Sequence, residues 1–72
     1  MKKVENQDKD LLKLSKLCQH WADHNNSHKE SFSKWRDTAK DKGLDEVVTN
    51  LNKAIKMIDK CSEYLLAAKQ NL

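Results

Sequence analysis

The sequence of 72 residues lacks proline and contains a single glycine, Gly43. No apolar run approaches the about 18 residues of a membrane-spanning helix, and the first residues hold no apolar stretch like that of a signal peptide. The two cysteines, Cys18 and Cys61, are too far apart for the C-x-x-C pairs of zinc knuckles or thioredoxin-type sites. We therefore expect a cytoplasmic protein with reduced thiols and no membrane contact.

Charged residues make up 35% of the chain and apolar residues 38%, a balance typical of amphipathic helices. The 14 basic and 11 acidic residues alternate along the chain and leave a net charge of +3. Nucleic-acid-binding proteins concentrate Lys and Arg on one face instead, so we expect no nucleic-acid partner. Chains this short bury only about 60% of their unfolded surface and usually need a metal or a partner chain.

A mostly apolar row of residues, with Asn25 and His28 as its polar members, repeats in alternating steps of three and four across the first half of the chain. The positions are Leu11, Leu14, Cys18, Trp21, Asn25, His28, Phe32, Trp35 and Ala39. This spacing predicts one long helix over about 8–41. An alternative breaks it near Asn25-Asn26-Ser27, because Ser27 and Glu30 match a capping box, and gives three helices. The unbroken repeat favours the continuous helix.

The second half predicts a helix over about 44–71, with acids in its first turn and a broad apolar stripe. Gly43 follows Lys40 and Lys42, where a glycine commonly ends a helix. The fold class is thus all-α: two helices that fold back as an antiparallel hairpin over 8–72, after a disordered tail over 1–7. One neighbour cannot cover the second stripe, so we expect a homodimer that forms a four-helix bundle. The expected core and dimer anchors are Trp21, Phe32, Trp35, Leu51, Ile58 and Leu65.

All three histidines, His20, His24 and His28, lie four residues apart on the first helix. Two histidines at this spacing can bind one ion, but the outer pair is about 12 Å apart, too far to share it. A turn near Gly43 places Cys61 level with His24, and likewise Met57 with His28 and Tyr64 with Trp21. The sequence therefore predicts a metal site of His24, His28 and Cys61, which His20, Cys18 or a second chain would complete.

Imidazole and thiolate ligands suit nickel, zinc, cobalt or copper. Asp23 and Glu30 could orient the rings or act as ligands themselves, and Cys18 could lie beside the site. The alternative is a protein-interaction or oligomerisation module that binds no ligand. In that case Asn25 and His28 set the register of the bundle, and the cysteines are small buried apolar residues.

The sequence gives little support for catalysis. His20 and His24 have the spacing of a zinc-protease helix, but Trp21 stands where that motif needs a glutamate base. There is no glycine-rich phosphate loop, and no serine or cysteine has an activating neighbour in a recognisable motif. We expect a protein that is not an enzyme.

The histidine segment, His20-Trp21-Ala-Asp-His24-Asn25-Asn-Ser-His28, resembles a family of small archaeal and bacterial helical domains of unassigned function. The family pattern is H-W-x-x-H-N-x-x-H, then F-x-x-W, a glycine-containing turn and a second helix. Some members are joined to or resemble small nickel-binding accessory proteins associated with carbon monoxide dehydrogenase and hydrogenase maturation. The resemblance implies metal handling by the three histidines, with a metalloenzyme maturation protein as a partner. Cys61 is not part of the pattern, and the second helix is richer in Lys and Asn.

Overall fold

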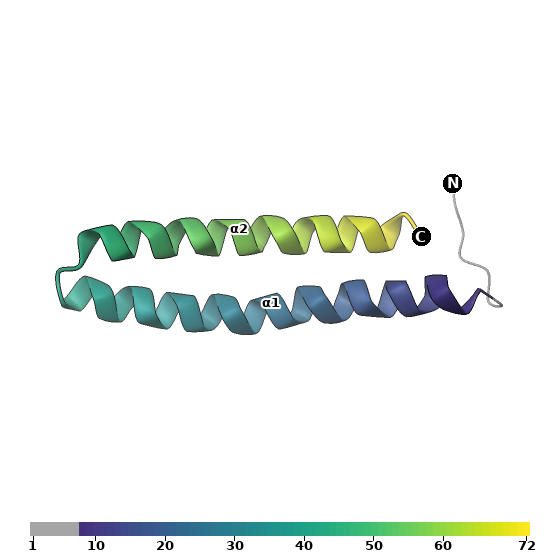
Figure 1. Ribbon diagram of the computed structural model, residues 1–72, viewed down its shortest axis with the longest axis horizontal. Coiled ribbons are helices and arrows are strands. Elements are labelled where there is room, and N and C mark those ends of the chain that lie inside the picture. Colours follow the sequence, from purple (N-terminus) through teal and green to yellow (C-terminus); the bar gives the residue numbers. More distant parts are fainter. Residues whose placement is uncertain (1–7) are drawn as a thin grey trace.

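The computed structural model describes residues 8–72, and the tail expected over 1–7 lies outside that range. Helix α1 spans Lys9–Asp41 and helix α2 spans Asp45–Gln70. The two helices run antiparallel and contact each other along their length (Figure 1). The hairpin measures 55 × 18 × 11 Å, so its two broad faces lie on either side of the plane of the helix axes. The predicted helical hairpin is confirmed, and the three-helix alternative is wrong because α1 continues through Asn25–Ser27.

Local chemistry sets both ends of α1, and the sequence predicted the one at Gly43. The Asp8 side chain caps the helix and accepts a hydrogen bond of 3.2 Å from the Leu11 amide. At the other end Gly43 has a φ of +75°, which L-residues rarely adopt. The Leu44 amide donates to the Ala39 carbonyl and the Gly43 amide to the Lys40 carbonyl, both at 3.0 Å. This pair of bonds is the Schellman motif, and it turns the chain into α2.

The two helices pack through one row of residues on each, which we call the inner seams. Both rows advance in alternating steps of three and four, as in coiled coils. The inner seam of α1 is Leu11, Ser15, Cys18, Ala22, Asn25, Lys29, Phe32, Arg36 and Ala39, and that of α2 is Val48, Leu51, Ile55, Ile58, Ser62, Leu65, Lys69 and Leu72. Every member of the two rows is buried or half-buried. Cross-links such as Asn25 to Ser62 and Lys29 to Asp59 join the two helices.

The repeat predicted for α1 is correct in every second position and wrong in the others. The predicted members Leu14, Trp21, His28 and Trp35 each give way to the next residue in the chain, as the inner seam shows. Trp21 is 43% exposed and Trp35 59% exposed, so neither indole is a core anchor of the hairpin. The physical reason is close packing: the buried residues are Cys18, Ala22 and Ala39, and such small side chains let the helices approach where an indole would hold them apart.

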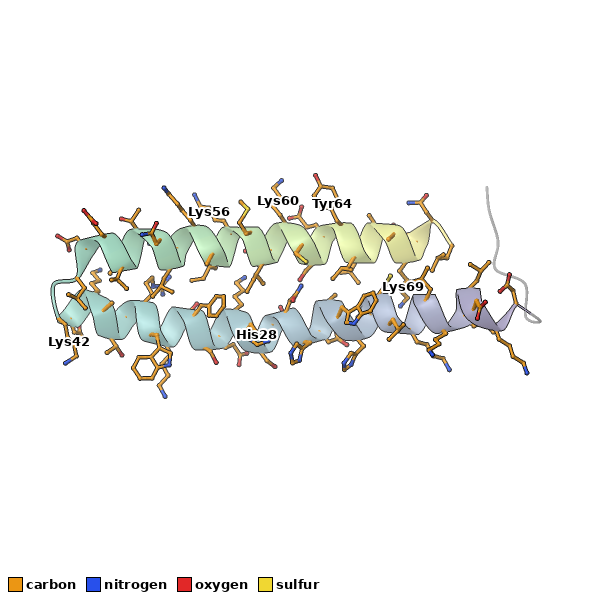
Figure 2. The ribbon with its side chains drawn as sticks, viewed as in Figure 1. His28, Lys42, Lys56, Lys60, Tyr64 and Lys69 are labelled. Carbon is orange, nitrogen blue, oxygen red and sulfur yellow. The ribbon has the colours of Figure 1, made fainter. Side chains whose placement is uncertain are left out.

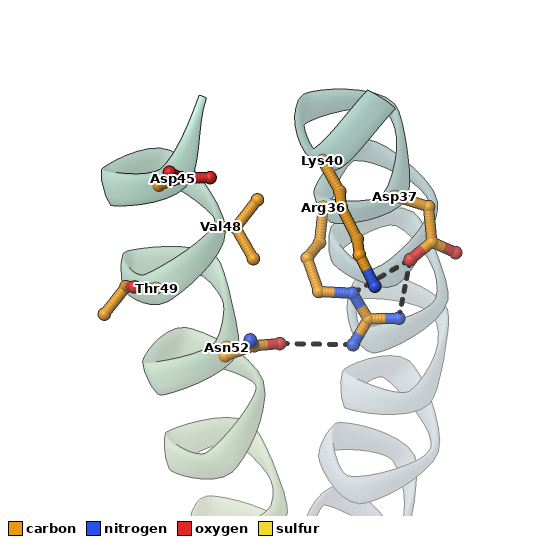
Figure 3. A pocket seen from close by; sticks show the side chains of 7 residues that line it. All are labelled: Arg36, Asp37, Lys40, Asp45, Val48, Thr49 and Asn52. Atoms are coloured by element: carbon orange, nitrogen blue, oxygen red, sulfur yellow. Dashed lines mark hydrogen bonds and ion pairs between the residues drawn. The ribbon is translucent and has the colours of Figure 1, made fainter. Parts of the chain in front are cut away.

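One broad face of the hairpin is polar. Arg36 pairs with Asp37 at 3.0 Å and donates to the Asn52 side chain at 3.2 Å across a shallow pocket (Figure 3). Lys40, Asp45, Val48 and Thr49 complete the lining of this pocket. Farther along the same side, the Lys29 ammonium lies 2.8 Å from the Asp59 carboxylate. The long stems of Arg36 and Lys29 therefore cross the inner seam and carry their charges to this face.

The opposite face carries a second row on each helix, again in steps of three and four, which we call the outer seams. On α1 it is Leu14, Leu17, Trp21, His24, His28, Ser31, Trp35 and Thr38, and on α2 it is Val47, Asn50, Ala54, Met57, Cys61, Tyr64 and Ala68. The hairpin exposes nine large apolar side chains among its described residues, and six of them lie in these rows. Each helix thus has two packing surfaces, and the hairpin uses only one. Neither described helix is long and apolar enough to cross a membrane.

Candidate metal site on the outer seam of α1

The three histidines occupy successive turns in the middle of α1, and all are exposed (Figure 2 labels His28). The rings of His24 and His28 meet edge to face, with centroids 4.5 Å apart at 84°. Their Nε2 atoms lie 2.9 Å from each other. The helix spacing of four residues places the two side chains on adjacent turns, which brings the rings together.

The short Nε2–Nε2 distance has a direct chemical meaning. Two neutral imidazoles can approach this closely when one ring donates its N–H and the other accepts it through its lone pair. A metal ion that replaced this proton would meet two nitrogen donors. On a tetrahedral ion with bonds of about 2.0–2.1 Å, two such nitrogens lie about 3.3 Å apart. The pair therefore needs to open by only a few tenths of an ångström to chelate an ion.

His20 stands outside this pair. Its ring is stacked on that of His24 with centroids 6.2 Å apart and an interplanar angle of 20°. Stacking presents the faces of the rings to each other, whereas a shared ion needs their nitrogen lone pairs to converge. The structure thus brings together two of the three predicted histidine ligands.

Cys61 lies near the same level of the hairpin but on the other helix. The cross-links from Asn25 to Ser62 and from Lys29 to Asp59 set the antiparallel register. They place Cys61 level with Ser27 rather than His24, and the predicted levels of Met57 and Tyr64 are wrong in the same direction. The reason is that the Schellman turn ends at Leu44, the N-cap of α2, so the hairpin is centred later in the chain than Gly43.

The remaining predicted site residues have other surroundings. Cys18 is 3% exposed and packs in the inner seam. The Asp23 carboxylate accepts a 3.0 Å hydrogen bond from the Gln19 amide, and Glu30 lines a shallow hollow with Asn26, Lys29 and Ser33. Within residues 8–72, no three His, Cys, Asp or Glu side chains form a group that could hold a metal ion. A metal bound at His24 and His28 must therefore take its other ligands from outside this hairpin.

The predicted anchors divide between the two seams. Phe32, Leu51, Ile58 and Leu65 lie in the inner seams, while Trp21 and Trp35 lie in the outer seam of α1. Sequence reasoning missed Leu17 and Ser31 as members of a second row. The sequence did carry a signal for this second row, because Leu14, Trp21, His28 and Trp35 recur every seven residues, as the residues of the inner seam beside them also do.

Comparison with known proteins gives a family and no annotated relative. No curated protein and no solved structure matches the chain. The sequence profile of a family described as a domain of unknown function, DUF8180, matches residues 14–72. The match begins in the second turn of α1, includes all three histidines and extends through the whole of α2. The chain is therefore a member of the DUF8180 family.

Proposed function

We propose that this protein binds a transition-metal ion, nickel, zinc or cobalt, through the imidazoles of His24 and His28. The observation that carries the proposal is the 2.9 Å approach of the two Nε2 atoms. The chemistry is coordination alone, suited to an accessory or storage protein rather than an enzyme. Nickel gains weight from the resemblance of the histidine segment to domains linked to nickel-binding accessory proteins, which would make a metalloenzyme maturation protein the natural partner.

Preorganisation supports the proposal. Both rings project from a helix that is held against α2, and they are in edge-to-face contact with each other. Binding an ion then costs little further side-chain entropy, whereas two unconstrained histidines would have to be ordered first. Both side chains are exposed, so an ion can reach them without opening the fold.

The first experiment is isothermal titration of the reduced, chelator-treated protein with Ni²⁺, Zn²⁺ and Co²⁺. We expect saturable binding with a dissociation constant of about 1 μM or lower for at least one ion, equivalent to about −8 kcal/mol. His24→Ala and His28→Ala should each abolish this binding, because one imidazole cannot chelate. Circular dichroism should show that both variants keep their helices, since both positions are exposed.

His20→Ala is the matched control. It removes the same side chain from the same helix, one turn away, and leaves the His24–His28 pair intact. We expect its affinity for the ion to stay within about threefold of the wild type, since the variant loses only a ring that stacks on His24 and keeps both proposed ligands. The absence of saturable heat with all three ions would overturn the proposal, as would equal losses in all three alanine variants.

A second candidate function is a helical interaction module without a ligand. It is favoured by the two unpartnered outer seams and by Asn25, whose side chain donates to the Ser62 hydroxyl at 3.1 Å in the middle of the inner seam. A polar pair at such a position can set the register of packed helices. Under this candidate, metal ions leave the thermal stability unchanged and His28→Leu stabilises the assembly.

A further inference from the structure

We propose that a second copy of this chain covers the outer seams, with a two-fold axis that crosses α1 midway between His24 and His28. The two α1 helices then pack antiparallel, and the His24–His28 pairs of both protomers meet at the axis. Four imidazoles would surround one ion shared by two chains. This inference rests on the metal site proposed above and adds its missing ligands.

The outer seam of α1 has the pattern of a helix that packs on another helix. Its eight positions alternate in steps of three and four without a break, as do those of the inner seam that contacts α2. Leu14, Trp21 and Trp35 are 39%, 43% and 59% exposed, which is costly for side chains of this size in water. A row with coiled-coil spacing and exposed indoles calls for another helix as its occupant.

Pairing rules select the register of the two α1 helices. The positions of a coiled-coil row belong to two sets that alternate along the helix. In an antiparallel pair of helices, a residue of one set lies opposite a residue of the other set, so the two-fold axis must fall midway between two residues of different sets. An axis between His24 and His28 gives the layers Leu14–Thr38, Leu17–Trp35, Trp21–Ser31 and His24–His28, and it uses every position of the row. Shifting the axis by half a heptad leaves end positions unpaired. The histidines also lie near the middle of Lys9–Asp41, so this axis gives nearly full overlap of the helices.

Size complementarity favours the same register. The bulky Trp21 lies opposite the small Ser31 of the partner subunit, and Leu14 lies opposite the smaller Thr38 of the partner subunit. Small residues, Ala54, Cys61 and Ala68, also recur in the outer seam of α2 and leave room for a close approach. The histidines occupy the two central layers, where each pair faces the other. A tetrahedral ion such as Zn²⁺ takes four ligands, the number that two such pairs provide.

The extent and charge of the face fit a second copy. The broad side of the hairpin measures 55 × 18 Å, enough for the roughly 800 Å² that each partner buries in a standard stable interface. The two outer seams hold no charged side chain, so two copies can meet without burying like charges. The charged groups of Arg36, Asp37, Lys40 and Asp45 lie on the opposite face, where they stay in water.

The test combines metal stoichiometry with molecular mass. Sedimentation equilibrium of the reduced 72-residue protein with and without Zn²⁺ should show a dimer whose dissociation constant falls by at least about tenfold when the ion is added. Titration should give one ion per two chains. One ion per monomeric chain would overturn this inference and leave the proposed function standing, whereas no binding at all would overturn both.

Leu14 and Leu12 provide a matched pair of variants for the interface itself. They are 39% and 38% exposed and lie two residues apart in the same turn, but only Leu14 belongs to the outer seam. We expect Leu14→Glu to raise the dissociation constant of the dimer by at least about tenfold, because it buries an unpaired carboxylate. Leu12→Glu should leave it unchanged. Equal effects of the two variants, or a monomeric wild type with Zn²⁺ bound, would contradict the inference.

Discussion

At the scale of single residues, polar side chains in the inner seam have specific partners on α2. Asn25 bonds to Ser62, Lys29 to Asp59 and Arg36 to Asn52. The sequence marked Asn25 as an anomaly in an apolar row, but it could not supply the partner, which lies 37 positions away in the chain. Lys29 and Arg36 were not predicted in the row at all, because charged residues rarely belong to a core unless their stems can reach its edge.

Replacing the central polar pair by apolar residues should stabilise the hairpin. Asn25→Leu combined with Ser62→Ala adds buried apolar area and leaves no unpaired polar group, so we expect a gain of about 1–2 kcal/mol in the free energy of unfolding. Urea unfolding followed by circular dichroism measures it. The matched control is Asn26→Leu, an exposed neighbour that should change the free energy by less than about 0.5 kcal/mol. If the double variant were less stable than the wild type, the Asn25–Ser62 pair would contribute to the stability of the hairpin and not only to the register of its helices.

At the scale of elements, helix limits follow from local chemistry while packing surfaces do not. Asp8 and Gly43 mark the ends of α1 through a side-chain cap and a left-handed residue, and both act within a few residues in sequence. Two interleaved rows on α1 both satisfy the coiled-coil spacing. Reasoning from hydrophobicity combined every second position of the inner seam with Leu14, Trp21 and Trp35 of the outer seam. The hairpin instead packs through a row in which Ser15 and Ala22 take the places of Leu14 and Trp21.

The turn between the helices depends on the backbone of Gly43. No heavy atom lies within 4 Å of where a Cβ would be, so the cost of Gly43→Ala comes from its φ of +75° alone. We expect the free energy of unfolding to fall by about 1 kcal/mol, which lowers the melting temperature by roughly 5 °C for a domain of this size. Thermal unfolding measures it. Gly43→Asn should cost less, because asparagine tolerates this conformation better. Equal losses for the two variants would contradict this explanation.

At the scale of the whole molecule, the hairpin buries too little to account for its amphipathic pattern. Of the described residues, Cys18, Ala22 and Ala39 are the buried ones, and none of them is large. Met57 and Tyr64 are 64% and 72% exposed on α2, and Figure 2 shows Tyr64 projecting from α2 away from α1. A lone hairpin of this size is expected to be marginally stable, so association should contribute much of its stability.

The stability of the metal-free protein should consequently depend on its concentration. If folding is coupled to dimer formation, a hundredfold increase in chain concentration stabilises the dimer by about 2.7 kcal/mol. The urea concentration at the midpoint of unfolding should therefore be higher at the upper end of this range of chain concentrations than at the lower end. Leu14→Glu should flatten the dependence, and Leu12→Glu should preserve it. A midpoint that does not change with concentration in the wild type would mean that the hairpin is stable alone.

The sequence by itself determined the two helices, their limits near Asp8 and Gly43, the antiparallel hairpin and the i, i+4 histidine pair. These features depend on interactions within a few residues, such as capping, glycine conformation and helix periodicity. Only the tertiary structure decided which of two equally spaced rows packs inward, that Cys61 lies level with Ser27, and that His20 stands apart from the His24–His28 pair. Those outcomes depend on how closely two helix backbones approach and where the turn ends, which residue spacing within one helix does not determine.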